Sequence, residues 1–151
     1  LKVACHTGCH YMRPTEIMQT EEDHESKKNL RKMVAATGAT IVDYDEEHLC
    51  CGYAIMNADQ DVSLRRLQKK LDSVINAGAD VLCLICPSCF TQIDNNQRNL
   101  KKKFEKEYNI PILYLTELLA LAMGFSSDEL ELKMHLQKPK IIQDKFEGGG
   151  V

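Results

Sequence analysis

The sequence contains no tryptophan, and aromatic residues make up only 6% of it. It also lacks an apolar run of the roughly 18 residues that a membrane-spanning helix needs, and no charged-then-apolar leader opens the chain. Neither sign of charge dominates, because 19 basic and 22 acidic residues leave a net charge of -3. Nucleic-acid binders and polybasic membrane-surface proteins need concentrated positive charge. We therefore expect a cytoplasmic protein that neither enters a membrane nor binds nucleic acid.

The length of 151 residues suits one domain with a conventional core, which needs no disulfides for stability. We expect the main domain to span residues 1–125. Residues 126–151 are expected to form a C-terminal helical extension and tail of the same domain. Strand-like sequence starts directly at Leu1, so we also expect the chain to be a fragment or a processed form of a longer protein.

Seven cysteines stand out in this composition. A secreted, oxidised domain normally pairs its cysteines evenly, whereas clustered cysteines inside the cell more often bind metal or take part in redox chemistry. The odd number and the clustering therefore favour a reducing compartment.

Short strand-like runs alternate with amphipathic segments along the chain. Strands are expected at 2–5, 40–44, 81–85 and 110–115, with helices between them and a last short helix capped by Thr116. The run at 81–85 is apolar throughout, as expected for a parallel strand covered by helices on both faces. The predicted fold is α/β, an open doubly wound sheet of about four parallel strands in a three-layer αβα arrangement.

Five cysteines follow the expected strands. Cys9 comes after the first strand, Cys50 and Cys51 after the second, and Cys86 and Cys89 after the third. In an open parallel sheet these loops share the carboxyl edge, where ligands bind. Several thiols gathered at one edge indicate a soft metal or an iron-sulfur cofactor. The other two cysteines, Cys5 and Cys83, lie inside apolar strands and are interpreted as core residues.

The spacing of these five motif cysteines, with Gly52 directly after the pair, resembles the CCG cysteine-rich domain family. Further features resemble the carboxy-terminal half of heterodisulfide reductase B-type subunits: His10, Arg13-Pro14, the Cys-Pro-x-Cys-Phe sequence ending at Phe90, and Leu115-Thr116-Glu117-Leu118-Leu119. The full subunits carry two such cysteine sets, and this chain carries one.

This resemblance implies that the five motif cysteines hold a non-cubane [4Fe-4S] cluster, with His10, Arg13 and Gly52 beside them. It implies an electron-transfer domain of an oxidoreductase, which is not expected to be active alone. The reaction would be reduction of the CoM-S-S-CoB disulfide, or electron passage in a related quinone-linked complex. The implied partners are the other half of the same subunit and ferredoxin-like and flavin-containing redox subunits, in a complex that can lie against a membrane.

Three alternatives stay open at this point. Four of the cysteines could form a closed structural zinc site in an interaction module. Cys86 and Cys89 could instead form a thioredoxin-like dithiol at the start of a helix, although that leaves Cys9, Cys50 and Cys51 unexplained. The cofactor could also be absent from the isolated half. His24 and His135 are assigned to solvated helix faces.

Overall fold

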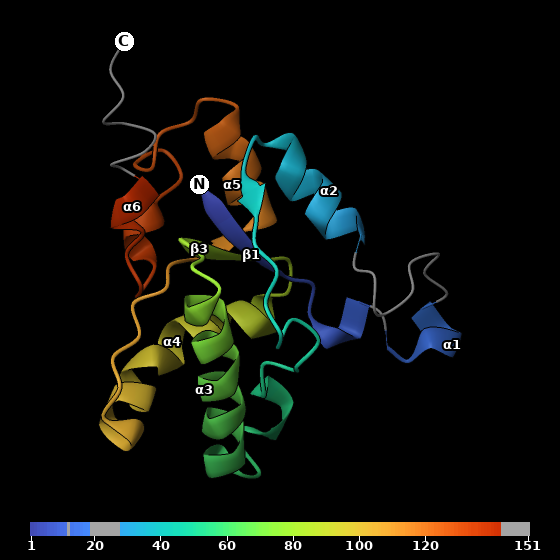
Figure 1. The fold of residues 1–151 in the computed structure, drawn as a ribbon, viewed down its shortest axis with the longest axis vertical. Helices are drawn as coiled ribbons and strands as arrows, with labels where there is room; N and C mark the ends of the chain where they lie inside the picture. Colours follow the sequence, from blue (N-terminus) through green and yellow to red (C-terminus); the bar gives the residue numbers. More distant parts are fainter. Residues whose placement is uncertain (12, 19–27, 143–151) are drawn as a thin grey trace.

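The computed structural model describes residues 1–11, 13–18 and 28–142, and Figure 1 shows their arrangement. It confirms the predicted fold class: four parallel strands form one open sheet in the order β2-β1-β3-β4. The strands are β1 (Lys2–His6), β2 (Thr40–Ile41), β3 (Val81–Leu84) and β4 (Ile112–Tyr114). Residues 143–151, the end of the expected C-terminal extension and tail, and the residue His24 lie outside the described residues.

The two central strands are neighbours in the sheet although β2 lies between them in sequence. β1 pairs with β3 from Val3 opposite Val81 to His6 opposite Leu84. The chain leaves β1 toward one side of the sheet and later continues from β3 toward the other. Their carboxyl ends therefore form the topological switch point, which is where open α/β sheets bind ligands.

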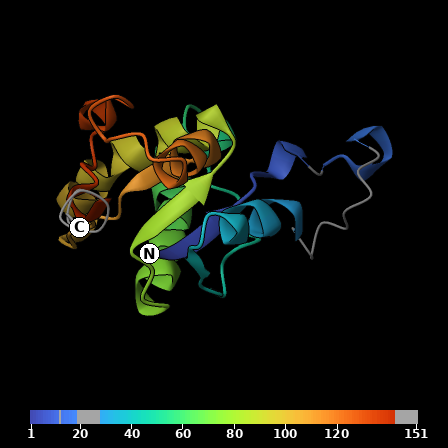
Figure 2. The same ribbon diagram turned by 90° about the horizontal axis from the view of Figure 1, so that it is seen from above.

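Helices cover both faces of the sheet. One apolar core joins α2 (Lys28–Ala36) and α5 (Leu115–Ala122) to one face, and a second core joins α3 (Gln60–Asn76) and α4 (Pro87–Phe104) to the other. The shorter elements are η1 (Cys9–Tyr11), α1 (Thr15–Met18), η2 (Tyr53–Ile55), η3 (Leu132–Met134) and α6 (Lys140–Ile142). Both views show α1 projecting away from the layers (Figure 2). No helix within the described residues is both long and apolar enough to cross a bilayer.

Two local features differ from the sequence expectation. The second strand pairs only over Thr40–Ile41, because the chain then turns and places the hydroxyl of Tyr44 so that it donates to the carbonyl of Cys5 at 2.9 Å. The last long helix begins one residue after Tyr114 rather than at a Thr116 cap. The Tyr114 N–H donates to the Glu117 carboxylate at 2.8 Å. This bond satisfies a backbone N–H at the start of the helix that has no partner within the helix.

The segment after α5 packs onto the same body. Leu132 and Ile142 are 1% and 0% exposed within the α2 and α5 core. The Asp94 carboxylate on α4 accepts the N–H groups of Leu136 and Gln137 at 2.8 and 2.9 Å. The expected boundary between a main domain at residues 1–125 and an extension at 126–151 stays a prediction.

The expectation for His135 was wrong. Its ring is buried, with Nδ1 3.0 Å from the carbonyl oxygen of Ile112 and Nε2 3.0 Å from the carboxylate of Glu117. It therefore belongs to the packed interior and not to a solvated face.

Candidate metal centre

The carboxyl edge of the sheet carries all five motif cysteines. Cys9 opens η1 just after β1, and Cys50 and Cys51 lie in the loop between β2 and α3. Cys86 is the N-cap of α4 and Cys89 lies in its first turn, so both follow β3 directly. Three segments that are distant in sequence thus bring their thiols to one edge.

The five sulfurs follow one another in a row. The Sγ atoms of Cys9 and Cys50 are 3.9 Å apart, and those of Cys51 and Cys89 lie within 4.8 Å of each other. The Cys51 sulfur accepts from the thiols of Cys50 and Cys89, and the Cys89 thiol also interacts with Cys86. The first and last cysteine of this row are 77 positions apart in the chain.

Cys5 and Cys83 stand apart from this row. They face one another in register on β1 and β3 and are 1% and 0% exposed in the core under α2 and α5. Burial raises the pKa of the Cys5 thiol to about 12 and raises that of Cys83 as well. Both thiols therefore stay protonated, in keeping with a packing role.

The sulfurs are unequally covered. Cys51 and Cys89, each 3% exposed, are the buried part of the site, which is here called the closed end. Cys9 and Cys50, both half-buried, form the open end, and Cys86 is half-buried beside Cys89. The protein therefore covers two of the five thiols and leaves the other three partly accessible.

Neighbouring thiols shift one another's protonation. The hydrogen bond from the Cys89 thiol lowers the pKa of Cys51 to about 6, against the effect of burial and with help from the Tyr53 backbone and the Lys70 charge. The same hydrogen bond raises the pKa of Cys89, which keeps its proton. Burial and the neighbouring Cys50 raise the pKa of Cys9. The closed end therefore holds one thiolate near neutral pH, which is the form that binds metal.

Two glycines let the backbone approach the sulfurs. At Gly8, with φ of +82°, an added Cβ would lie 3.0 Å from the Cβ of Cys86 and 3.5 Å from the sulfur of Cys89. At Gly52, with φ of +89°, it would lie 3.0 Å from both the carbonyl oxygen and the hydroxyl of Ser63. The Gly52 N–H also donates to the sulfur of Cys50 at 3.5 Å. Only glycine combines this conformation with such close contacts.

Buried hydrogen bonds fix the Cys-Cys-Gly loop to the helices behind it. The Ser63 hydroxyl on α3 donates to the carbonyl of Gly52 at 2.8 Å, and the Gln92 amide on α4 donates to that hydroxyl at 2.9 Å. Ser63 is 0% and Gln92 is 1% exposed. Gln92 lies three residues after Cys89 on α4. These hydrogen bonds therefore fix the distance between the loop that carries Cys51 and the helix that carries Cys89.

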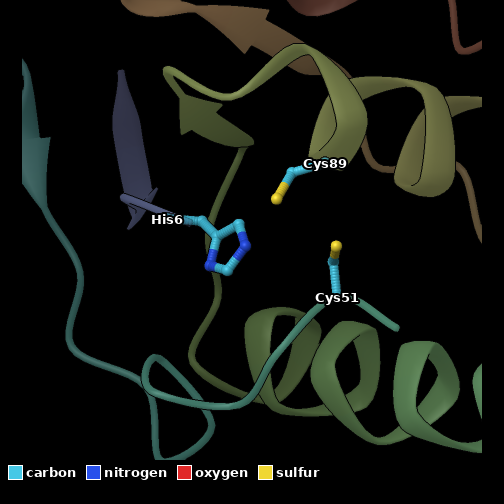
Figure 3. Close-up of side chains that lie close together, drawn as sticks. All are labelled: His6, Cys51 and Cys89. Carbon is cyan, nitrogen blue, oxygen red and sulfur yellow. The ribbon is translucent and has the colours of Figure 1, made fainter. Parts of the chain in front are cut away.

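His6 is a site residue that sequence analysis did not assign. It ends β1, is 2% exposed, and faces the sulfurs of Cys51 and Cys89 (Figure 3). The ligand atoms of these three residues lie within 4.8 Å of one another. The alternation of side chains along β1 could have indicated its place. Val3 and Cys5 pack into the core under α2 and α5, whereas Ala4 packs into the core under α3 and α4. His6, two residues after Ala4, therefore shares the face of Ala4.

His10 and Arg13 lie near the open end. His10 is exposed on η1, and the exposed Arg13 donates its backbone N–H to the carbonyl of Cys9 at 3.0 Å. Their part beside the ligands stays a prediction. A buried cation was not anticipated: Lys70, 0% exposed, donates to the carbonyl of Glu46 at 2.5 Å and lies over the Tyr44 ring.

The donor set suits a soft metal or an iron-sulfur group, because thiolates are the ligands that such cofactors take. The family model described as "Cysteine-rich domain", CCG, matches residues 3–94, which include all five motif cysteines. The chain belongs to the CCG cysteine-rich domain family. The cysteine pair and the Cys-Pro-x-Cys sequence that resemble this family are the segments that the fold brings together.

Curated relatives of this CCG domain are subunits of redox complexes. The chain is 39% identical over 137 residues to the B subunit of the ferredoxin:CoB-CoM heterodisulfide reductase of Methanosarcina mazei, covering 89% of this chain and 45% of the relative. It is 32% identical to an Archaeoglobus profundus protein named as similar to the B subunit of heterodisulfide reductase, covering 86% and 44%. It is 27% identical to the 8-methylmenaquinol:fumarate reductase membrane anchor subunit of Wolinella succinogenes, covering 87% and 46%. The chain thus spans less than half the length of these relatives.

Proposed function

We propose that this domain holds a non-cubane [4Fe-4S] cluster through Cys9, Cys50, Cys51, Cys86 and Cys89 and transfers electrons within a heterodisulfide reductase-like complex. The observation that carries the proposal is the meeting of these five cysteines, from the loops after three parallel strands, at the carboxyl edge of the sheet. When bound, such a cluster supplies one-electron redox chemistry.

The chain's own residues prepare the site for this role. The Cys51 thiolate is present near neutral pH, so the closed end needs little proton release before it binds metal. Gly8 and Gly52 keep side-chain bulk away from the sulfurs, and the Gly52 N–H donates to Cys50. Such N–H donors to sulfur stabilise negative charge at the site and raise its reduction potential.

The substrate and partners are inferred from the relatives. Two of them carry the name heterodisulfide reductase, so we propose a disulfide of the CoB-CoM class as the final electron acceptor. We propose the other half of the same subunit and ferredoxin-like and flavin-containing subunits as partners. The Wolinella relative is a membrane anchor subunit, which supports a complex lying against a membrane.

A single zinc ion is the second candidate occupant. The close grouping of His6, Cys51 and Cys89 favours it, because one metal ion could contact all three ligand atoms. A lone Cys86–Cys89 dithiol is less favoured, since both thiols belong to a row of five.

Elemental analysis under anaerobic conditions tests the proposal. The purified chain should be brown and contain several irons and acid-labile sulfides, and Cys50→Ser should remove most of them. Cys83→Ala is the matched control, because Cys83 is buried in the other core, and it should retain the iron. A colourless protein with one zinc, or equal iron loss in both variants, contradicts the proposal.

A further inference from the structure

The backbone of His6 is held rigidly at the switch point. It is the last residue of β1 and lies opposite Leu84 in the central pair of strands. Its ring points into the space between the Cys51 loop and the first turn of α4 (Figure 3). With 2% of the residue exposed, the imidazole is shielded from solvent.

The three groups that meet here have unequal hydrogen-bonding capacities. A thiolate sulfur, free or bound to metal, only accepts, whereas an imidazole ring carries at least one N–H at any pH that proteins tolerate. The ring nitrogen and the sulfurs of Cys51 and Cys89 already lie within 4.8 Å of one another. Because the closed end excludes water, a donor placed here acts at low dielectric, where its effect on charge is large.

We propose that His6 is a positioning residue that donates a ring N–H hydrogen bond to the sulfurs of Cys51 and Cys89 when the site is loaded. This inference rests on the proposed function. Reduction adds negative charge to the sulfurs, so a donor that faces them favours the reduced state and raises the reduction potential.

His48 provides the matched control. It lies two residues before Cys50, in the loop that follows β2, and it is exposed. A change there alters a loop that carries site cysteines without removing a buried donor. Comparing the two variants separates the loss of the buried imidazole at the closed end from a general disturbance of the site.

The experiment measures the midpoint potential of the iron-loaded chain by spin resonance during a redox titration. His6→Phe, which keeps a planar ring without a donor, should lower the one-electron equilibrium constant for reduction about tenfold, or about 59 mV, at unchanged iron content. His6→Gln restores an N–H and should regain most of this loss. His48→Phe should match the unchanged chain. An unchanged potential in His6→Phe, or an equal fall in His48→Phe, overturns the inference.

A second measurement does not depend on iron or on a variant that folds. The unchanged chain is loaded with ¹¹³Cd²⁺, and its histidine rings are observed by proton–nitrogen NMR. The inference expects a His6 ring N–H that exchanges slowly with solvent and has no one-bond coupling to cadmium. Rapid exchange of that proton overturns it, and so does a one-bond nitrogen–cadmium coupling, which would make His6 a ligand. Absence of iron in the anaerobic protein would reject the proposed function while this test of His6 still gives its answer.

Discussion

Gly52 shows how one backbone conformation limits the site. Its φ of +89° and the 3.0 Å approach of Ser63 to an added Cβ mean that a side chain would be strained twice, by conformation and by contact. The cysteine pair directly before it can face the other sulfurs because this residue has no side chain.

We therefore predict that Gly52→Ala destabilises the protein by about 2–4 kcal/mol, combining the left-handed penalty with overpacking. Gly38→Ala is the control, since Gly38 has φ of +81° but nothing within 4 Å of an added Cβ. It should cost only about 1–2 kcal/mol. Urea unfolding of the two variants measures the difference, and equal costs would show that contact with Ser63 does not matter.

At the scale of elements, two helices and a loop share one polar connection. The Gly52 carbonyl, the Ser63 hydroxyl and the Gln92 amide form consecutive hydrogen bonds between the Cys-Cys-Gly loop, α3 and α4. All three residues are buried, so each unmade bond would leave a polar group without water.

A double-mutant cycle tests this connection. Ser63→Ala and Gln92→Met should each cost about 1–3 kcal/mol, and the pair should show a coupling energy of about 0.5–3 kcal/mol because they share a bond. Both variants should also load less metal, as the spacing of Cys51 and Cys89 relaxes. Thr37→Val, which removes the hydroxyl bond to the carbonyl of Val34 at the end of α2, serves as the reference. Strict additivity of Ser63 and Gln92 would refute the connection.

His135 joins the C-terminal segment to β4 and α5. Burial alone would lower its pKa, but the hydrogen bond to Glu117 and the charges of Glu117 and Asp94 outweigh burial and raise the pKa above 6.5. The ring also packs edge-on against Phe90, with centroids 4.9 Å apart. Both ring nitrogens face oxygen acceptors, which suits the protonated imidazolium.

This arrangement predicts a pH-dependent contribution to stability. Because the folded-state pKa is raised, the contribution is complete below pH 6.5 and is lost as the pH rises through the folded-state value. The difference in unfolding free energy between the unchanged chain and His135→Gln should therefore shrink from pH 6 toward alkaline pH. Chemical denaturation across that range measures it. A difference that grows with pH would show that the imidazolium is not the stabilised form.

At the scale of the whole molecule, the topology joins segments that lie far apart in sequence. Cys9 and Cys50 come from the loops after β1 and β2, and their sulfurs are 3.9 Å apart at the open end. In the metal-free chain these two thiols are neighbours and both half-buried, so an oxidant reaches them together although the pKa of Cys9 is raised.

We predict that mild oxidation of the metal-free protein with diamide forms a Cys9–Cys50 disulfide first. Peptide mapping by mass spectrometry identifies the bond, and Cys50→Ser should suppress it. The resulting loop of about 40 residues should stabilise the oxidised chain by roughly 3–4 kcal/mol. A Cys86–Cys89 bond as the first product would contradict this order of reactivity.

Much of this arrangement could be predicted from sequence. The glycines at 38 and 78 mark the ends of helices that precede strands. Because the loops after parallel strands lie at one edge of the sheet, the meeting of the thiols could be predicted without knowing any side-chain contact. Contacts across elements could not be predicted. His6 looks like a loop residue beside Gly8, and Lys70 looks like a surface lysine, until the fold places both in the interior. Likewise Tyr44 leaves the second strand to reach Cys5, a pairing that local pattern does not encode.

The unequal covering of the sulfurs also gives the metal-free site an order of chemical accessibility. A thiol reagent from solution meets Cys9, Cys50 and Cys86 before it reaches the buried sulfurs of Cys51 and Cys89, so alkylation should begin at the rim of the site and reach its centre last.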